Sequence, residues 1–130
     1  MGKINNFIVR ILDLFRTVIA KLDSNVIIGA NTIIKFKANL LTRDGGKISI
    51  GERCTVESGA VLDTCGGFIK IGNDSSVQIG TVLYGHGGLT IGDGVRIATG
   101  TKIIPANHGF KDIGVKIYKQ DLSKKGIIIN

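Results

Sequence analysis

Histidine and cysteine are the side chains best suited to acid–base or nucleophilic chemistry, and this chain has few of them. Among its 130 residues are two histidines, His86 and His108, and two cysteines, Cys54 and Cys65. An imidazole, with an ordinary pKa near 6.5, can take a proton from a hydroxyl group close to neutral pH. A lone histidine in a loop is more often a plain surface residue. The structural elements around each histidine therefore decide whether it can act as an acid–base catalyst.

The two cysteines do not make a disulfide framework, and a reducing, cytoplasmic compartment is expected. Cys54 lies in a repeat position that is always occupied by a small residue, so it should pack as a small hydrophobe. Nothing but its position favours Cys65 as a nucleophile. No metal site is predicted.

Aliphatic residues recur at every sixth position in units of 20 to 22 residues. Each unit begins with Ile-Gly. The three sets are Ile28, Ile50, Ile71, Ile91; Ile34, Val56, Val77, Ile97; and Leu40, Leu62, Leu83, Ile103. Four residues beyond each member of the first two sets stands a small or β-branched residue: Thr32, Ala38, Cys54, Ala60, Ser75, Thr81, Val95 and Thr101.

A period of six fits neither a helix nor an ordinary alternating strand. It predicts three short strands per triangular coil, with the aliphatic side chains stacked inside and the small residues near the corners. The third face is longer and ends in glycine pairs at 45–46, 66–67 and 87–88, where a tight corner requires positive φ. Chains rich in glycine and turns are typical of such solenoids.

The period breaks once, after Ile103. The segment 126–130 resembles 88–92, so about eighteen residues are inserted, and we expect a loop at about 105–125. Long loops on rigid scaffolds commonly carry function. This loop contains Asn107 and His108. Stacked corners should bring them to one edge with Tyr84 and His86.

Residues 1–23 form a separate segment. Ile4, Ile8, Ile11, Phe15, Val18 and Leu22 follow a helical spacing. The segment is predicted to be an amphipathic helix that is too charged and too short for a transmembrane span, and no cleavage site for a signal peptide follows it. It could cap the open first coil, or lie on a membrane surface as a peripheral contact. The remainder, 24–130, is predicted to be one repeat domain.

This hexad pattern, from about residue 26 to 130, resembles the hexapeptide-repeat acyltransferases, in particular the maltose, galactoside and polysaccharide O-acetyltransferases. The resemblance implies an all-β, left-handed parallel β-helix; the spacing alone does not set the handedness. It also implies a homotrimer that transfers an acetyl group from acetyl-CoA to a sugar or glycan hydroxyl, in polysaccharide biosynthesis. His108 matches the general base. Asn107, His86, Tyr84 and, less closely, Gln78 match substrate-binding positions.

The chain departs from that family after residue 130. Relatives continue into a Trp-containing hexad and further coils that form much of the coenzyme A groove, whereas this sequence has no Trp. We therefore expect weak binding of acetyl-CoA by this chain alone, whether it is a fragment, a naturally shortened protein or half of a split enzyme. A non-catalytic assembly or binding subunit is the alternative. A γ-class carbonic anhydrase of the same fold would need three histidines, which argues against that activity.

The net charge of +7 raises the question of an anionic partner. The basic residues are scattered and have no interleaved aromatic side chains. Nucleic acid is therefore not expected as a partner.

Overall fold

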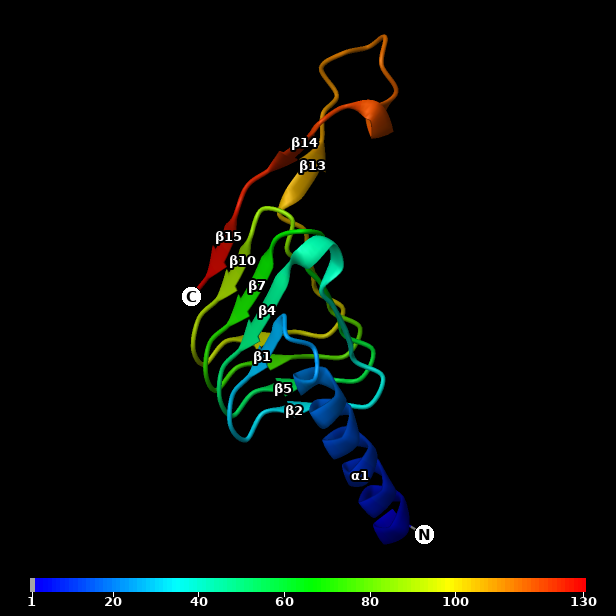
Figure 1. Cartoon of the computed structure of the whole chain (residues 1–130), viewed down its shortest axis with the longest axis vertical. Coiled ribbons are helices and arrows are strands. Elements are labelled where there is room, and N and C mark those ends of the chain that lie inside the picture. Colours follow the sequence, from blue (N-terminus) through cyan, green and yellow to red (C-terminus); the bar gives the residue numbers. More distant parts are fainter. Residues whose placement is uncertain (1) are drawn as a thin grey trace.

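The computed structural model describes residues 2–130 as a parallel β-solenoid of about four turns, preceded by one helix, α1 (Gly2–Lys21). Figure 1 shows the stacked coils with α1 at one end and a hairpin projecting from the other. The first sheet contains β1 (Val26–Ile28), β4 (Lys47–Ile50), β7 (Phe68–Ile71), β10 (Leu89–Ile91) and β15 (Ile127–Ile129). The second contains β2 (Ile33–Ile34), β5 (Thr55–Val56), β8 (Ser76–Val77) and β11 (Arg96–Ile97). The third contains β3 (Asn39–Leu41), β6 (Val61–Asp63), β9 (Val82–Tyr84) and β12 (Lys102–Ile103).

The predicted columns of aliphatic side chains are confirmed by the strand register. In the second sheet Ile34 pairs with Val56, Val56 with Val77, and Val77 with Ile97. These side chains are almost fully buried, as Val77 at 1% exposed shows. The inserted segment also returns in the predicted register, because Ile129 pairs with Ile91. The six-residue period therefore identifies the core.

The first sheet carries a second buried column that the hexads do not include. Val26, Ile48, Ile69, Leu89 and Ile127 lie opposite one another in successive strands. Strands of the first sheet are longer, up to four residues, so two inward positions fit on each. The first face thus contributes about twice as many core side chains per coil as the second.

Small residues at the corners also connect neighbouring coils by hydrogen bonds. The Thr32 hydroxyl donates to the Gly51 carbonyl (2.7 Å) and accepts from the Cys54 amide (2.9 Å). Between the third and fourth coils, the Ser75 hydroxyl donates to the Gly92 carbonyl (2.9 Å). These buried corner groups are satisfied without water.

The glycine pairs of the third face have two separate functions. Gly66 and Gly88 have φ of 79° and 91°, as a tight corner requires. Gly87 has ordinary φ but packs closely: a Cβ there would lie 2.8 Å from the Lys125 amide nitrogen and the Pro105 carbonyl oxygen. The corner at 86–88 therefore touches the base of the projecting hairpin.

Helix α1 packs against the first coil through polar side chains. The Asp13 carboxylate, 4% exposed, accepts hydrogen bonds from the Phe36 amide (2.8 Å) and the Lys35 ammonium (3.0 Å). Thr17 Oγ1 accepts from the Ile34 amide (2.9 Å), and the Arg16 guanidinium donates to the Ala38 carbonyl (3.1 Å). These contacts satisfy the unpaired edge of the first coil, as a solenoid cap must.

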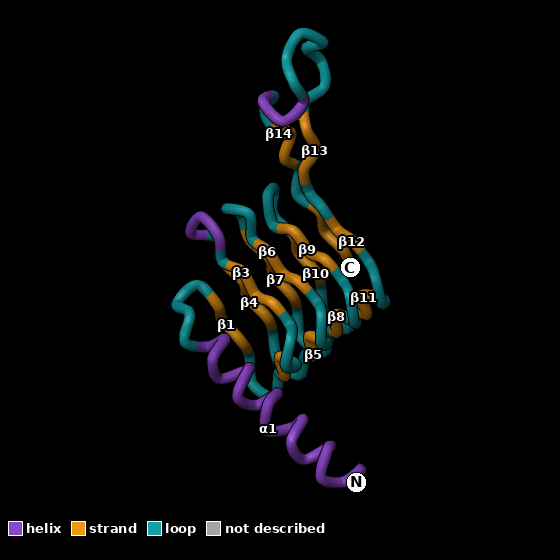
Figure 2. Tube along the Cα trace, turned by 90° about the vertical axis from the view of Figure 1, so that its right-hand side faces the viewer, coloured by secondary structure: helices purple, strands orange, loops and turns teal. Residues whose placement is uncertain are grey.

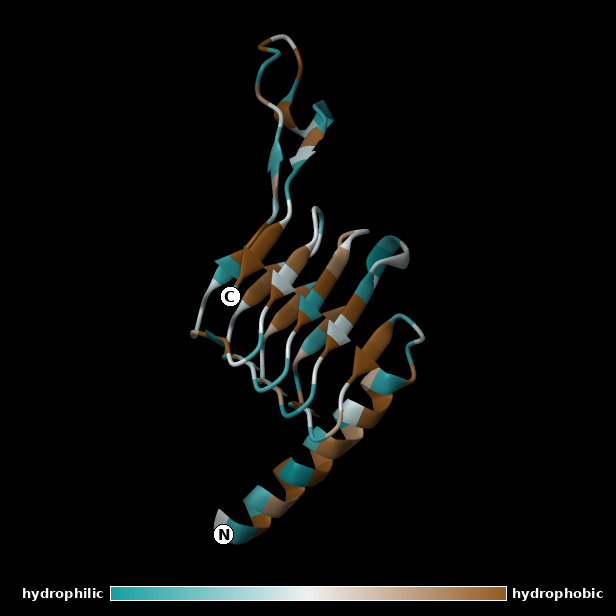
Figure 3. Cartoon of the chain, turned by 90° about the vertical axis from the view of Figure 1, so that its left-hand side faces the viewer, coloured by the Kyte–Doolittle hydropathy of each residue, from teal (hydrophilic) through white to brown (hydrophobic). Residues whose placement is uncertain are grey.

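The side chains that suggested an amphipathic helix are exposed rather than packed into the solenoid core. We call them the apolar face of α1, although its last member lies just beyond the helix. To the six predicted residues, Ile4, Ile8, Ile11, Phe15, Val18 and Leu22, the structure adds three exposed neighbours on the same side of the helix, Phe7, Leu14 and Ile19. Figure 3 shows brown bands that alternate with teal ones along the helix. α1 therefore caps the first coil, but with its polar side rather than with its hydrophobic one. It is not long and apolar enough to cross a membrane.

Asp13→Ala should loosen this cap. The change removes a buried carboxylate that accepts two hydrogen bonds, one of them from a charged group. We expect the free energy of unfolding to fall by about 2 kcal/mol in urea titrations, and α1 to be cleaved faster by a protease. Asn6→Ala, at an exposed position of the same helix, should change neither measurement. Equal behaviour of the two variants would contradict the polar docking.

Candidate functional site

The inserted segment leaves the solenoid after β12 and forms a projecting hairpin. Its strands are β13 (Ala106–His108) and β14 (Leu122–Lys124), which pair antiparallel, with Asn107 opposite Ser123 and His108 opposite Leu122. Figure 2 shows this hairpin extending well beyond the stacked coils. The chain then returns to the first sheet as β15.

The tip of the hairpin is held by Gln120. Its amide nitrogen donates to the carbonyls of Asp112 and Val115, both at 2.9 Å. A short 3₁₀ turn, Ile117–Lys119, precedes it. The tip is therefore closed by its own hydrogen bonds, although its side chains are almost all exposed.

His108 lies exposed beside a hollow of about 420 Å³ on the hairpin. The hollow is lined by Asn107, His108, Gly109, Phe110, Lys111, Gln120, Asp121 and Ser123. Asn107 and Ser123 also border a second hollow of about 340 Å³ at the hairpin base. Of the residues predicted for the site, the structure brings Asn107 and His108 together.

No side chain within residues 2–130 forms a hydrogen bond to the His108 ring. The ring is thus accessible to a bound molecule, and no neighbour fixes its tautomer. Asp121 is the acidic residue among those that line the same hollow. Sequence reasoning missed Asp121, Lys111 and Ser123, because their positions depend on how the hairpin folds back.

Tyr84 and His86 lie at the corner after β9, not in the hollow around His108. Their rings are 5.6 Å apart between centroids and inclined by 57°. Pro105 lies against this corner, next to Gly87. His108 is three residues further along an extended strand, or about 10 Å away from Pro105. The four residues expected at one edge therefore lie in two places. Tyr84 and His86 are at the corner, whereas Asn107 and His108 are on the hairpin.

The His86 ring has an orphan atom: Nδ1 is buried and has no hydrogen-bond partner among residues 2–130. Buried polar atoms are normally paired, so this nitrogen is a candidate contact for a ligand or a bound water. The equivalent corner of the preceding coil is polar. Asp63, paired in register with Tyr84, contacts the Arg43 guanidinium at 3.3 Å and accepts from the Cys65 amide at 3.1 Å.

Cys65 is poorly suited to nucleophilic chemistry. Burial, followed by the nearby Asp63 carboxylate, raises the pKa of its thiol to about 11. The reactive form is the thiolate, which is therefore scarce at neutral pH. Cys54 is buried, and its Sγ donates to the Gly72 carbonyl at 3.0 Å.

Gln78 lies on another side of the solenoid. It follows β8 in the second sheet, and its side-chain nitrogen donates to Ser76 Oγ at 3.2 Å. Tyr84 ends β9 of the third sheet, and His86 and His108 come after β9 and β12 of that sheet. Within one chain, Gln78 therefore does not meet the other predicted residues.

No group of three or more His, Cys, Asp or Glu side chains within residues 2–130 is arranged to hold a metal ion. Comparisons with models of known protein families, with curated proteins and with solved structures gave no match. The geometry itself defines the class: a parallel β-solenoid consistent with a hexapeptide repeat, which presents a histidine on a projecting hairpin.

Proposed function

We propose that this protein is a CoA-dependent O-acetyltransferase that acts on a sugar hydroxyl, with His108 as general base. The observation that carries the proposal is the single break in the hexad solenoid, which presents an accessible imidazole beside a hollow. The sequence resemblance to sugar O-acetyltransferases supplies the reaction class. The resemblance rests on the hexad pattern from about residue 26 to 130, and the assignment of the base rests on the inserted segment.

The chemistry requires little from the protein beyond positioning and a base. The sugar oxygen attacks the thioester carbonyl carbon, a C–O bond forms, and the C–S bond breaks. The hydroxyl proton passes to the His108 imidazole and from there to the departing thiolate of coenzyme A. Asn107 and Ser123 line the hollow and can hold sugar hydroxyls by hydrogen bonds.

The charge of the hairpin suits an anionic donor. Its exposed lysines are Lys111, Lys116, Lys119, Lys124 and Lys125, against two aspartates, Asp112 and Asp121. Such a field attracts the phosphates of coenzyme A. The outer edges of β11, β12 and β15, next to the hairpin, have no neighbouring strand within residues 2–130. A complete donor groove therefore needs a wall from a further coil or a second subunit, and we propose a homotrimer as the working form.

A non-catalytic binding or assembly subunit is the second candidate. It is favoured by the apolar side chains at the hairpin tip, where Phe110, Ile113 and Tyr118 are 73%, 101% and 68% exposed. Such side chains are typical of a contact with another protein surface. A hairpin that serves only as such a contact would need no catalytic base.

An acetyl-transfer assay separates the two candidates. The assembled fraction from sedimentation is incubated with radiolabelled acetyl-CoA and a panel of sugars, and acetylated sugar is detected by mass spectrometry. We expect transfer by the assembled protein and weak acetyl-CoA binding by the monomer. An assembled protein that binds sugar, yet neither binds nor consumes acetyl-CoA, would refute the enzyme and favour the binding subunit.

A further inference from the structure

The apolar face of α1 is largely exposed. The direction in which it faces follows from the side of the helix that contacts the first coil. With about 100° between successive residues of a helix, Asp13 and Thr17 define the side that touches the coil. The centre of the apolar face, near Ile4, Ile11 and Phe15, lies on the opposite side. Phe7, Leu14 and Phe15 remain 65%, 62% and 61% exposed. Figure 1 also shows the N-terminal half of α1 projecting past the coils.

Cations flank this face on one side. Lys3, Arg10 and Lys21 are all exposed and recur at seven and eleven residues, which brings them to one side of the helix. The acidic residue of α1 is Asp13, which is buried against Lys35. The charged side chains that α1 exposes are therefore all cationic.

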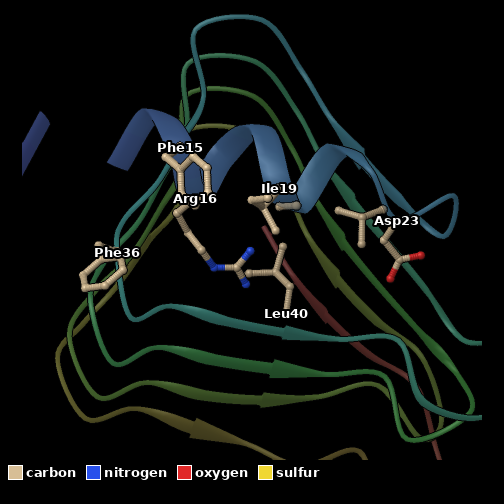
Figure 4. Close-up of a pocket in the computed structure, with 8 residues that line it drawn as sticks. Phe15, Arg16, Ile19, Asp23, Phe36 and Leu40 are labelled. Atoms are coloured by element: carbon tan, nitrogen blue, oxygen red, sulfur yellow. The ribbon is translucent and has the colours of Figure 1, made fainter. Parts of the chain in front are cut away.

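A hollow of about 390 Å³ between α1 and the first coil continues this surface. Figure 4 shows α1 lying across the triangular outline of the coils, with the hollow beside Phe15 and Ile19 of the apolar face. Arg16 reaches into it among Phe36 and Leu40. Asp23 is at its far end, where the carboxylate accepts hydrogen bonds from Thr42 Oγ1 (2.6 Å) and the Asn25 amide (2.9 Å). The hollow thus combines apolar walls with a guanidinium and, at its far end, a carboxylate that is already hydrogen-bonded to Thr42 and Asn25.

We propose that the apolar face of α1 docks on an anionic lipid bilayer, parallel to its surface. A helix with aromatic and aliphatic residues on one side and lysine and arginine at its border fits the boundary between headgroups and acyl chains. The cations contact anionic headgroups, and Arg16 offers a further headgroup contact in the hollow.

A second copy of the chain suits this surface less well. A helix pair needs a narrow apolar seam bordered by charges of opposite sign. Here the apolar face spans nearly half of the helix, and its border carries Lys3, Arg10 and Lys21 without an exposed acidic residue of α1. Two such faces would bring like charges together. The charge pattern is complementary to anionic lipid instead.

Vesicle flotation tests the proposal on the full chain, with phosphatidylcholine vesicles that contain or lack phosphatidylserine. We expect binding to the anionic vesicles, weaker at high salt. The variant Phe7→Gln with Phe15→Gln should bind at least tenfold more weakly. Its matched control, Phe110→Gln with Tyr118→Gln, removes two equally exposed aromatic side chains from the hairpin and should bind normally.

A charge variant tests the choice of anionic lipid. Lys3→Gln, Arg10→Gln and Lys21→Gln together should reduce binding to anionic vesicles at least tenfold. The same loss of charge at Lys47, Lys70 and Lys102, exposed on the coils, should have a much smaller effect. Circular dichroism verifies that each variant retains its fold.

Two outcomes would overturn the proposal. One is a wild-type chain that ignores anionic vesicles while the Phe7 and Phe15 changes convert an oligomer into a monomer, which would assign the face to a second copy. The other is vesicle binding that does not respond to either set of helix changes. Neither outcome depends on acetyl transfer.

Discussion

Val77→Asp should prevent the chain from folding. Val77 is 1% exposed and lies between Val56 and Ile97 in the second sheet. A carboxylate there would be buried in an aliphatic column with no cation or hydrogen-bond donor to receive it. The cost, about 4 kcal/mol or more, is a large part of the stability of a typical domain. Circular dichroism and urea titration should show an unfolded or barely stable chain.

Asn73→Asp is the matched control, on the same coil. Asn73 is exposed, and its side-chain oxygen accepts a hydrogen bond from the Glu52 amide at 2.8 Å. An aspartate retains that acceptor, so the free energy of unfolding should change by less than about 1 kcal/mol. Similar stability of the two variants would rule out the six-residue register.

Much of the solenoid could be predicted because its core is periodic. Each inward aliphatic stacks on the equivalent residue of the next coil, as Ile50 does on Ile71. One coil therefore specifies the next. The return of Ile127 and Ile129 to the first sheet followed from the same local pattern.

The docking of α1 could not be predicted from periodicity. Hydrophobic spacing predicts that the apolar side of a helix faces the core. The first coil, however, presents backbone amides at Ile34 and Phe36 that need acceptors, and Thr17 and Asp13 supply them. Nothing in the spacing of the sequence distinguishes Asp13 from the other charged residues of this segment.

Periodicity could predict where the inserted segment begins and ends, but not where its side chains lie. An insertion has no counterpart in the neighbouring coils, so stacking says nothing about where its residues lie. Asn107 and His108 were assigned to the corner of Tyr84 and His86, but β13 pairs with β14 and takes them outward. Only the base of the hairpin, at Pro105, remains against that corner.

His108→Ala should reduce acetyl transfer by about 10²-fold to 10⁴-fold if the imidazole is the base. The loss should appear in kcat, because proton transfer occurs in the transition state and not on binding. Stability should stay almost unchanged, since His108 is exposed on the hairpin and belongs to no buried column. The kinetics are measured on the assembled protein with acetyl-CoA and the sugar identified in the transfer assay.

Two further variants distinguish a role of His108 in proton transfer from a role in binding. His108→Gln keeps a hydrogen-bonding side chain but cannot take a proton, so it should be as slow as His108→Ala. Ser123→Ala, which lines the same hollow, removes a hydroxyl and should affect mainly KM. If His108→Gln retains wild-type kcat, the imidazole binds rather than catalyses, and the base must be sought elsewhere. His86 at the neighbouring corner, whose Nδ1 has no hydrogen-bond partner among residues 2–130, would then be the first residue to replace.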